Sequence, residues 1–224
     1  MSLNTILDKL ETEVKKPDFK DNVIMDYGSD GETSSVWYEA GYTPDDFDDG
    51  KFPEEPEGAE WDDALEKYID NRWYDFRNKF SKIAKMQDGK LKIYRKITLE
   101  SVPKFLYYLN KGKPIKGFKG IGVFWSWDKD QAEAHWGHGK YAKKLVLIEG
   151  LVGINDIEYE STASKNLNPS LGEEEAEIEV NENAAITIVK VHSKEHGQDV
   201  WQGEVKVAAK FKEAVLSRYK IVSR

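Results

Sequence analysis

The stretch EAEIEVNENAAITI, residues 175–188, decides the predicted fold. Its first half alternates glutamates with apolar residues, its centre is Asn-Glu-Asn, and its second half is an apolar strand pattern. Alternation with a period of two is typical of a β-strand that buries one face, and a short polar group between two such runs is typical of a hairpin. We therefore predict strands at 175–180 and 184–191, joined by a turn at 181–183.

The first of these strands carries an unusual row of acids. In an extended chain, Glu175, Glu177 and Glu179 share one face, with neighbours ~7 Å apart. Two carboxylates at this spacing can serve two parts of one reaction, as in enzymes that cleave glycosidic bonds. The alternative is an edge strand whose charged outer face opposes aggregation, and the strand taken alone favours that alternative.

The rest of the chain predicts an α+β fold, with strands in the middle and helices around them. Asp128 has the character of an N-cap for one short helix, and Asp88-Gly89 of a helix end. We predict further strands at 90–97 and 143–153, a Gly-rich loop running into a strand over 116–127, and helices at 4–16, 60–86, 99–112, 128–136 and 204–219.

Composition divides the chain into two parts. Of the 224 residues, 39% are hydrophobic, which is enough for a core, and the net charge is -8. Acids outnumber bases in residues 1–88, whereas bases slightly outnumber acids in residues 89–224. We predict an acidic extension of helices and loops at 1–88, loop-rich from 26 to 60, and a functional domain at 89–224. The acidic part would repel nucleic acid, so we expect no direct binding to it.

Several classes of protein are excluded by what the sequence lacks. It has no cysteine, so a disulfide, a thiolate metal site or a thiol nucleophile is excluded. No apolar run approaches the ~20 residues of a membrane span and no signal-peptide pattern opens the chain, so we expect a cytoplasmic protein without membrane contact. His135 and His138, and likewise His192 and His196, are pairs without an indicated third ligand, so we expect no metal site.

Two segments upstream of the acids add to the pattern. Arg95 lies inside the apolar stretch IYRKI, where a charge is costly unless it finds a partner or an anionic ligand. Further on, VFWSWDKDQAEA joins a strand end with aromatic residues and Ser126 to the short helix that follows Asp128. The order is therefore strand arginine, aromatic and serine, then Glu-x-Glu on a strand.

The region from about Leu91 to Val191 resembles the mono-ADP-ribosyltransferases of the Arg–Ser–Glu type, which include bacterial toxins and phage enzymes that modify host proteins. The stretch EAEIEVNENAAITI matches the Glu-x-Glu motif with its turn and following strand, and IYRKI matches the aromatic-arginine motif. The middle motif departs from the usual Ser-Thr-Ser, because Ser126 stands between two tryptophans. The resemblance implies a split β-sandwich core with flanking helices, and NAD as the substrate without a metal.

The family assigns a role to each matched residue. Arg95 would bind the NAD pyrophosphate, and Ser126 would hold Glu177 in place. Glu177 would stabilise the positive charge that develops on the ribose as nicotinamide leaves. Glu175 would orient and deprotonate the acceptor, and a glutamate at this position marks a protein arginine as the acceptor.

Further contacts with NAD are predicted around these residues. Backbone N–H groups near Gly120 and Gly122 would help to bind the pyrophosphate. Flat rings suit nicotinamide, and alternation leaves Phe124 and Trp127 on one face, so we favour these two over Trp125, with core packing as the alternative for each. Residues 160–171 are predicted to be a target-recognition loop.

Two classes of function follow from the sequence. The first is an enzyme that transfers ADP-ribose from NAD to a protein arginine and releases nicotinamide. The second is a non-catalytic, acidic protein-binding module with a degenerate transferase-like fold.

Overall fold

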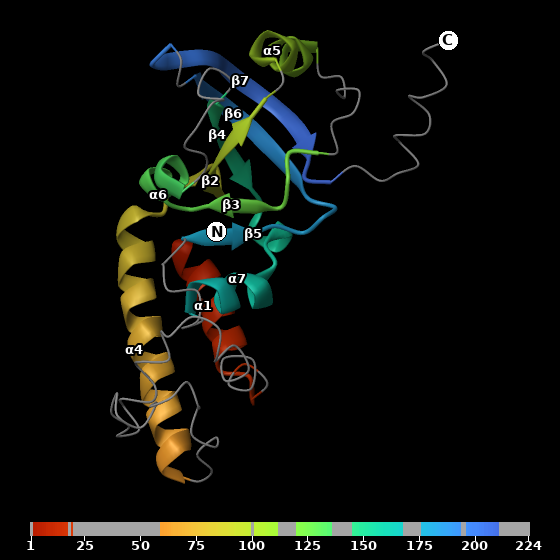
Figure 1. Cartoon of the computed structure of the whole chain (residues 1–224). Helices are drawn as coiled ribbons and strands as arrows, with labels where there is room; N and C mark the ends of the chain where they lie inside the picture. The colour runs from red at the N-terminus through yellow and green to blue at the C-terminus, as the bar shows by residue number, and fades with distance from the viewer. Residues whose placement is uncertain are drawn as a thin grey trace, which may run out of the picture. The chain divides into compact units, whose positions relative to one another are not determined.

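The structure is a computed structural model that describes residues 2–17, 19, 59–99, 101–111, 120–135, 145–167, 176–193 and 196–210. It confirms a mixed α+β architecture, with an antiparallel sheet and separate helices (Figure 1). The elements in chain order are α1 (Leu3–Val14), α4 (Ala59–Ile83), β1 (Met86–Gln87), β2 (Lys90–Thr98), α5 (Val102–Lys111), β3 (Phe124–Ser126), α6 (Lys129–His135), β4 (Leu145–Val152), a 3₁₀ turn (Ile154–Asp156), α7 (Tyr159–Leu167), β5 (Glu177–Glu179), β6 (Ala185–Ser193) and β7 (Gln198–Ala208).

The chain divides into two compact units that are not continuous in sequence. One contains the sheet and comprises residues 1–3, 83–158 and 175–224; the other comprises residues 4–82 and 159–174 and is built from helices. The predicted boundary at residue 88 separates an acidic extension from a functional domain. It is a statement about function, and it stays a prediction. The predicted loop-rich segment lies outside the described residues up to position 58.

The helical unit is built from α1, α4 and α7. Each helix buries apolar side chains at helical spacing, including Ile6 and Leu10 of α1, and Leu65 and Phe80 of α4. The Lys9 ammonium lies 5.0 Å from the centre of the Tyr159 ring, so α1 and α7 meet there. Residues 160–167 belong to α7, so the predicted loop at 160–171 is wrong for its described part. Buried side chains of α7 recur with helical spacing, and its polar composition concealed that pattern.

The sheet has the strand order β5–β3–β2–β4–β6–β7, and β1 pairs with β2 beside this row. Every pairing is antiparallel. Its core is apolar: Leu91, Ile93, Ile148 and Ile188 are fully buried. By contrast, β2 meets β3 at one residue pair, Tyr94 with Ser126.

Three predictions about the sheet are wrong. The turn after Val180 exists, but β5 pairs with β3 whereas β6 pairs with β4 and β7, so these strands form no hairpin. Asp88 and Gly89, both with positive φ, form the two-residue turn between β1 and β2 instead of ending α4. Residues 204–208 belong to β7 instead of a helix, because pairing with β6 suits their alternating pattern; residues 211–219 lie outside the described part.

Candidate functional site

Arg95 projects from β2 toward the loop that leads into β3. Its Nη1 donates a hydrogen bond to the carbonyl oxygen of Phe124. Its Nε is buried and has no hydrogen-bond partner among the described residues. Burial lowers the pKa of Arg95, and the negative charge of Glu177 acts in the opposite direction. Arg95 is thus a half-buried cation whose Nε donor is unused among the described residues.

Gly122 lets the guanidinium group take this place. Its φ is +94°, and a Cβ added to it would lie 2.5 Å from Cζ of Arg95. Gly120 has a φ of +116°, and an added Cβ would overlap the backbone of Ala209. Both glycines therefore allow a close approach that a side chain would block.

Backbone hydrogen bonds attach this loop to the end of β7. The N–H of Gly122 donates to the carbonyl oxygen of Ala209 at 2.9 Å, and the N–H of Ile121 donates to that of Ala208 at 3.0 Å. The prediction that N–H groups near Gly120 and Gly122 bind pyrophosphate stays a prediction, and the Gly122 N–H is engaged within the protein in this arrangement. Its donor is already used to attach the loop to the end of β7.

Ser126 and Glu177 face each other across two short strands. They are direct partners in the β3–β5 register, and each side chain is buried, at 8% exposure. Paired residues on adjacent strands project to the same face. The Ser126 hydroxyl bonds to main-chain atoms of Asp128 and Ala176, so its link to Glu177 runs through the backbone before β5.

Ala176 has an unusual backbone conformation for a residue with a side chain. Its φ is +50°, in the left-handed region. Strand alternation holds only for extended residues, so the argument that set residues 175 and 177 on one face does not cross this position. Glu175 itself lies outside the described residues. Glu179, by contrast, shares the extended strand with Glu177.

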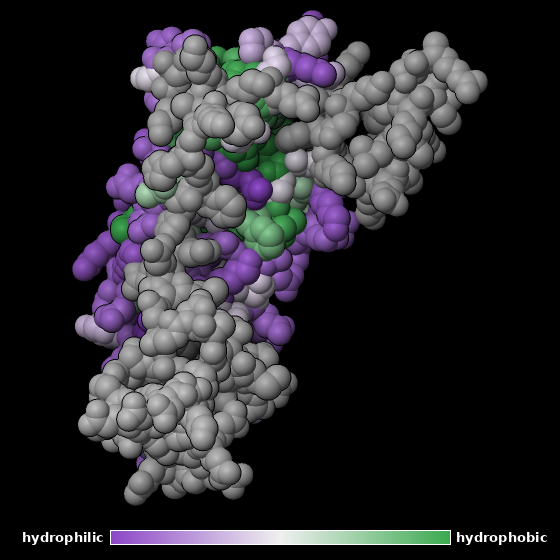
Figure 2. Space-filling model, in the orientation of Figure 1, coloured by the Kyte–Doolittle hydropathy of each residue, from purple (hydrophilic) through white to green (hydrophobic). Residues whose placement is uncertain are grey.

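The aromatic residues of the serine motif differ in exposure. Phe124 is 39% exposed, whereas Trp125 and Trp127 are 3% and 2% exposed. On the face seen in Figure 2, apolar residues of the sheet unit reach the surface among hydrophilic ones. Because Trp127 is almost fully buried, it occupies a core position, and core packing was the stated alternative to a contact with nicotinamide. Of the two favoured rings, Phe124 is the one that a ligand can reach.

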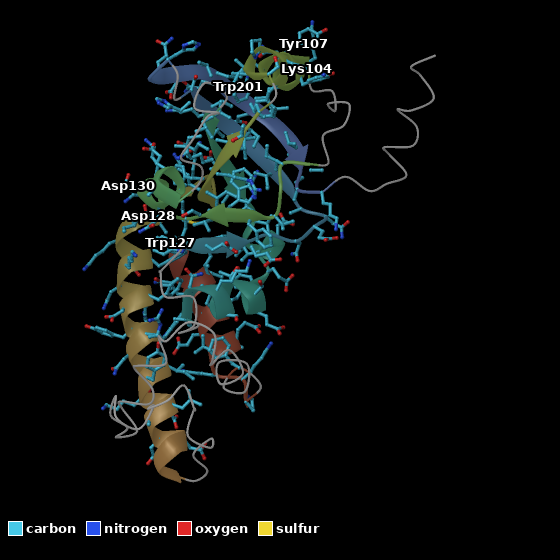
Figure 3. All side chains as sticks on the ribbon, viewed as in Figure 1. Lys104, Tyr107, Trp127, Asp128, Asp130 and Trp201 are labelled. Atoms are coloured by element: carbon cyan, nitrogen blue, oxygen red, sulfur yellow. The ribbon has the colours of Figure 1, made fainter. Side chains whose placement is uncertain are left out.

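Two residues of this region were not predicted as site residues. Tyr94 lies opposite both Ser126 and Glu149, and its pKa is raised to about 12, by burial first and then by the charges of Glu149 and Asp128. Asp128 follows the end of β3 and begins α6, as Figure 3 shows for the run from Trp127 to Asp130. The sequence predicted that Asp128 caps a helix. A helix cap does not by itself predict that the main chain of Asp128 is hydrogen-bonded to the Ser126 hydroxyl.

Within the ranges that the structure describes, no group of three or more His, Cys, Asp or Glu side chains is placed to hold a metal ion. Among the same residues, no helix is long and apolar enough to cross a membrane. His192 is engaged with Asp199, at 3.1 Å from Nδ1 to Oδ1. The side chain of His135, and His138, lie outside the described residues.

Comparison of the chain with protein-family models, with curated proteins and with solved structures finds no match. The function is therefore argued from the geometry of this site.

Proposed function

We propose that this chain is an NAD-dependent protein ADP-ribosyltransferase of the Arg–Ser–Glu type, with an arginine side chain of another protein as acceptor. The observation that supports the proposal is that three neighbouring strands carry Arg95, Ser126 and Glu177. Ser126 of β3 pairs with Glu177 of β5, Tyr94 beside Arg95 on β2 pairs with Ser126, and the charge of Glu177 acts on the pKa of Arg95. The fold that goes with this proposal is a split β-sandwich. The single residue pair between β2 and β3 supports it.

The residues present fit NAD as the substrate. A half-buried arginine whose Nε has no partner among the described residues has a donor and a charge to offer to a pyrophosphate, and Gly122 leaves the space in which the guanidinium lies. The exposed ring of Phe124 is a surface on which a flat base can stack. The Phe124 carbonyl, which now accepts from Arg95, would give up part of that bond when a phosphate arrives.

The chemistry assigned to Glu177 is electrostatic. In the proposed reaction the bond from the ribose C1′ to the nicotinamide nitrogen breaks, and nicotinamide leaves with the electron pair. A guanidinium nitrogen of the acceptor then bonds to C1′ and loses a proton to a carboxylate, the role proposed for Glu175. The negative charge of Glu177 stabilises the positive ribose, and a fixed group of this kind contributes about 3–4 kcal/mol.

The proposal is tested with labelled NAD and mixed cell lysate. The wild-type chain should transfer label to protein and release nicotinamide. Glu177→Gln should lower both activities by ~10²–10³ while the protein still unfolds at the same denaturant concentration. Glu179→Gln is the matched control, because Glu179 lies on the same strand and the same face, and this variant should keep both activities.

Two outcomes would decide against parts of the proposal. If the folded wild-type chain neither labels protein nor hydrolyses NAD, the non-catalytic protein-binding module is the better explanation. Glu175→Gln should remove transfer to protein and spare some NAD hydrolysis. If that variant leaves arginine modification intact, Glu175 is not the acceptor-side base.

A further inference from the structure

We propose that Asp128 is a positioning residue for Glu177, acting through Ser126 and the carbonyl group of Ala176. The catalytic consequence rests on the proposed function, but the mechanical connection between these residues does not. A continuous set of hydrogen bonds runs from the first turn of α6 to the residue that precedes Glu177. We call residues 126–128 together with Ala176 the serine clamp.

The first part of the connection is the cap of α6. The Asp128 carboxylate is buried, with 7% of the residue exposed, and its Oδ1 accepts the N–H groups of Asp130 at 2.9 Å and Gln131 at 3.4 Å. The Asp128 carbonyl accepts the N–H of Ala132 at 3.1 Å. These bonds fix the main chain of Asp128 to the helix, since they satisfy donors that a helix start otherwise leaves unpaired.

The helix is itself attached to the sheet. The Lys96 ammonium, on β2, donates to the carbonyl oxygen of Glu133 at 2.6 Å. Lys96 is 8% exposed, so this bond is largely shielded from water. A cation that meets a carbonyl near the end of a helix is favourable for the helix dipole. The main chain of Asp128 is therefore held relative to β2, which also carries Arg95.

The second part of the connection is Ser126. Its hydroxyl accepts the N–H of Asp128 at 3.0 Å and shares its proton between the carbonyl oxygens of Asp128, at 2.8 Å, and Ala176, at 3.0 Å. The N–H of Trp127 donates to the same Ala176 carbonyl at 3.0 Å. Two donors from consecutive residues thus hold one carbonyl oxygen, and their position depends on where Asp128 is fixed.

The third part is the strained backbone of Ala176. A left-handed conformation costs a residue with a side chain about 1–2 kcal/mol and persists only when the surroundings hold it. Glu177 is the next residue and the first of β5, where a three-residue strand is easiest to fray. Release of the Ala176 carbonyl would allow φ to return to the extended region. The peptide that enters Glu177 would then turn, and its carboxylate would move away from Arg95.

The test compares the loss of two helix caps in the same unit. Asp128→Ala removes the cap of α6 and with it the anchor of the serine clamp. Ser101→Ala is the matched control, because the Ser101 Oγ accepts the N–H of Lys104 at 3.3 Å at the start of α5 and has no bond to the serine clamp. Asp128→Asn keeps an oxygen that can accept the same N–H groups, so it should restore what Asp128→Ala loses.

Kinetics of NAD hydrolysis give the first measurement. Asp128→Ala should lower kcat by about 10- to 100-fold, since small displacements of a reacting group have effects of this size, while KM for NAD stays near the wild-type value. Ser101→Ala should leave kcat unchanged, and Asp128→Asn should recover it. Equal losses in Asp128→Ala and Ser101→Ala would overturn the proposal, as would failure of Asp128→Asn to recover kcat.

A second measurement does not need activity. Hydrogen exchange of the Trp127 amide and the ¹³C chemical shift of the Glu177 carboxyl carbon should both change in Asp128→Ala and stay unchanged in Ser101→Ala. If the wild-type chain hydrolyses no NAD, the proposed function is wrong, and these two signals still test the connection. If the Trp127 amide exchanges at the wild-type rate in folded Asp128→Ala, the connection is overturned.

Discussion

The two parts of the sheet are held together in different ways. From β2 through β4 and β6 to β7, neighbouring strands pair over most of their length, and both faces of β4 are buried at nearly every position. Between β3 and β5 there are three residue pairs, and one pair connects β3 with β2. The candidate site lies at this weaker junction, except that Arg95 belongs to β2 and pairs with Ile148 in the long ladder.

The difference shows what positions each part. In the long ladder, burial of apolar side chains and repeated backbone pairing determine the position of each residue. At the junction the residue pairs are too few to determine the positions of the side chains. Individual contacts do so instead: Gly122 packs on the Arg95 guanidinium, Ser126 donates to the Ala176 carbonyl, and Asp128 caps α6. A site built this way depends on a few atoms, so single substitutions should separate stability from activity.

The largest effect is expected from matched isoleucines in the two parts. Ile148 on β4 and Ile178 on β5 are both 0% exposed. Replacing either with alanine should lower the free energy of unfolding by about 2–5 kcal/mol, which denaturant titration measures. Ile148→Ala should keep activity per folded molecule, whereas Ile178→Ala should lose it. If Ile178→Ala retained full activity, β5 would not depend on its few contacts.

The next effect concerns two glycines with positive φ. An added Cβ at Gly122 would meet the Arg95 guanidinium, whereas an added Cβ at Gly89 would meet nothing within 4 Å. Gly89→Ala should therefore cost only the backbone term of about 1–2 kcal/mol. Gly122→Ala should cost more in denaturant titration and should also weaken NAD binding by calorimetry, because Arg95 must move. Equal effects of the two variants on both measurements would contradict the role of Gly122.

A smaller effect of opposite sign is expected at Ala176. Glycine adopts a positive φ without steric strain, so Ala176→Gly should raise the free energy of unfolding by up to about 1 kcal/mol. The gain is limited because glycine has more freedom to lose on folding. Thermal and denaturant unfolding measure it. A clear loss of stability would mean that Ala176 is not strained.

The last effect is a pH dependence from Tyr94, which appears only at alkaline pH. Its pKa in the folded chain is about 12, above the ordinary value of 10.0, because burial and nearby carboxylates disfavour the phenolate. The unfolded chain therefore ionises first as the pH rises, so Tyr94 should lower stability between about pH 10 and 12 and have no effect below. Tyr94→Phe should remove that part of the alkaline loss, which unfolding at pH 9 and pH 11 would detect. An identical alkaline loss in both proteins would refute the assignment.

The sequence predicted much of the fold for local reasons. Clear periodicity or end signals mark four of its elements: the strand of Arg95, the buried strand at 143–153, the helix that Asp128 caps and the long aromatic helix. The errors arose where partners distant in the sequence decide. The segment after Glu204 has a weak alternating pattern, and it is a strand because it pairs with β6. The predicted hairpin does not form because its first strand pairs with β3 and its second strand pairs with β4.

For the site, the sequence identified residue types and their order but not their contacts. Arg95, Ser126 and Glu177 were predicted from motifs, and the structure sets Ser126 opposite Glu177 and Arg95 on the neighbouring strand β2, while their shared role stays a prediction. The link from Ser126 to the Ala176 carbonyl joins residues 50 positions apart, so no local pattern reveals it. Exposure likewise separated Phe124 from Trp127, which look alike in sequence.

The sequence by itself determined most of the helices and strands, and which ionisable residues lie within them, because spacing and capping act over a few residues. Tertiary structure alone decided that the three strands carrying Arg95, Ser126 and Glu177, which come from distant parts of the chain, lie next to one another in the sheet. It also decided that Ala176 adopts a strained conformation beside them. The physical reason is that these features depend on cross-strand pairing and shared burial, which are set by the whole unit and not by neighbours in sequence.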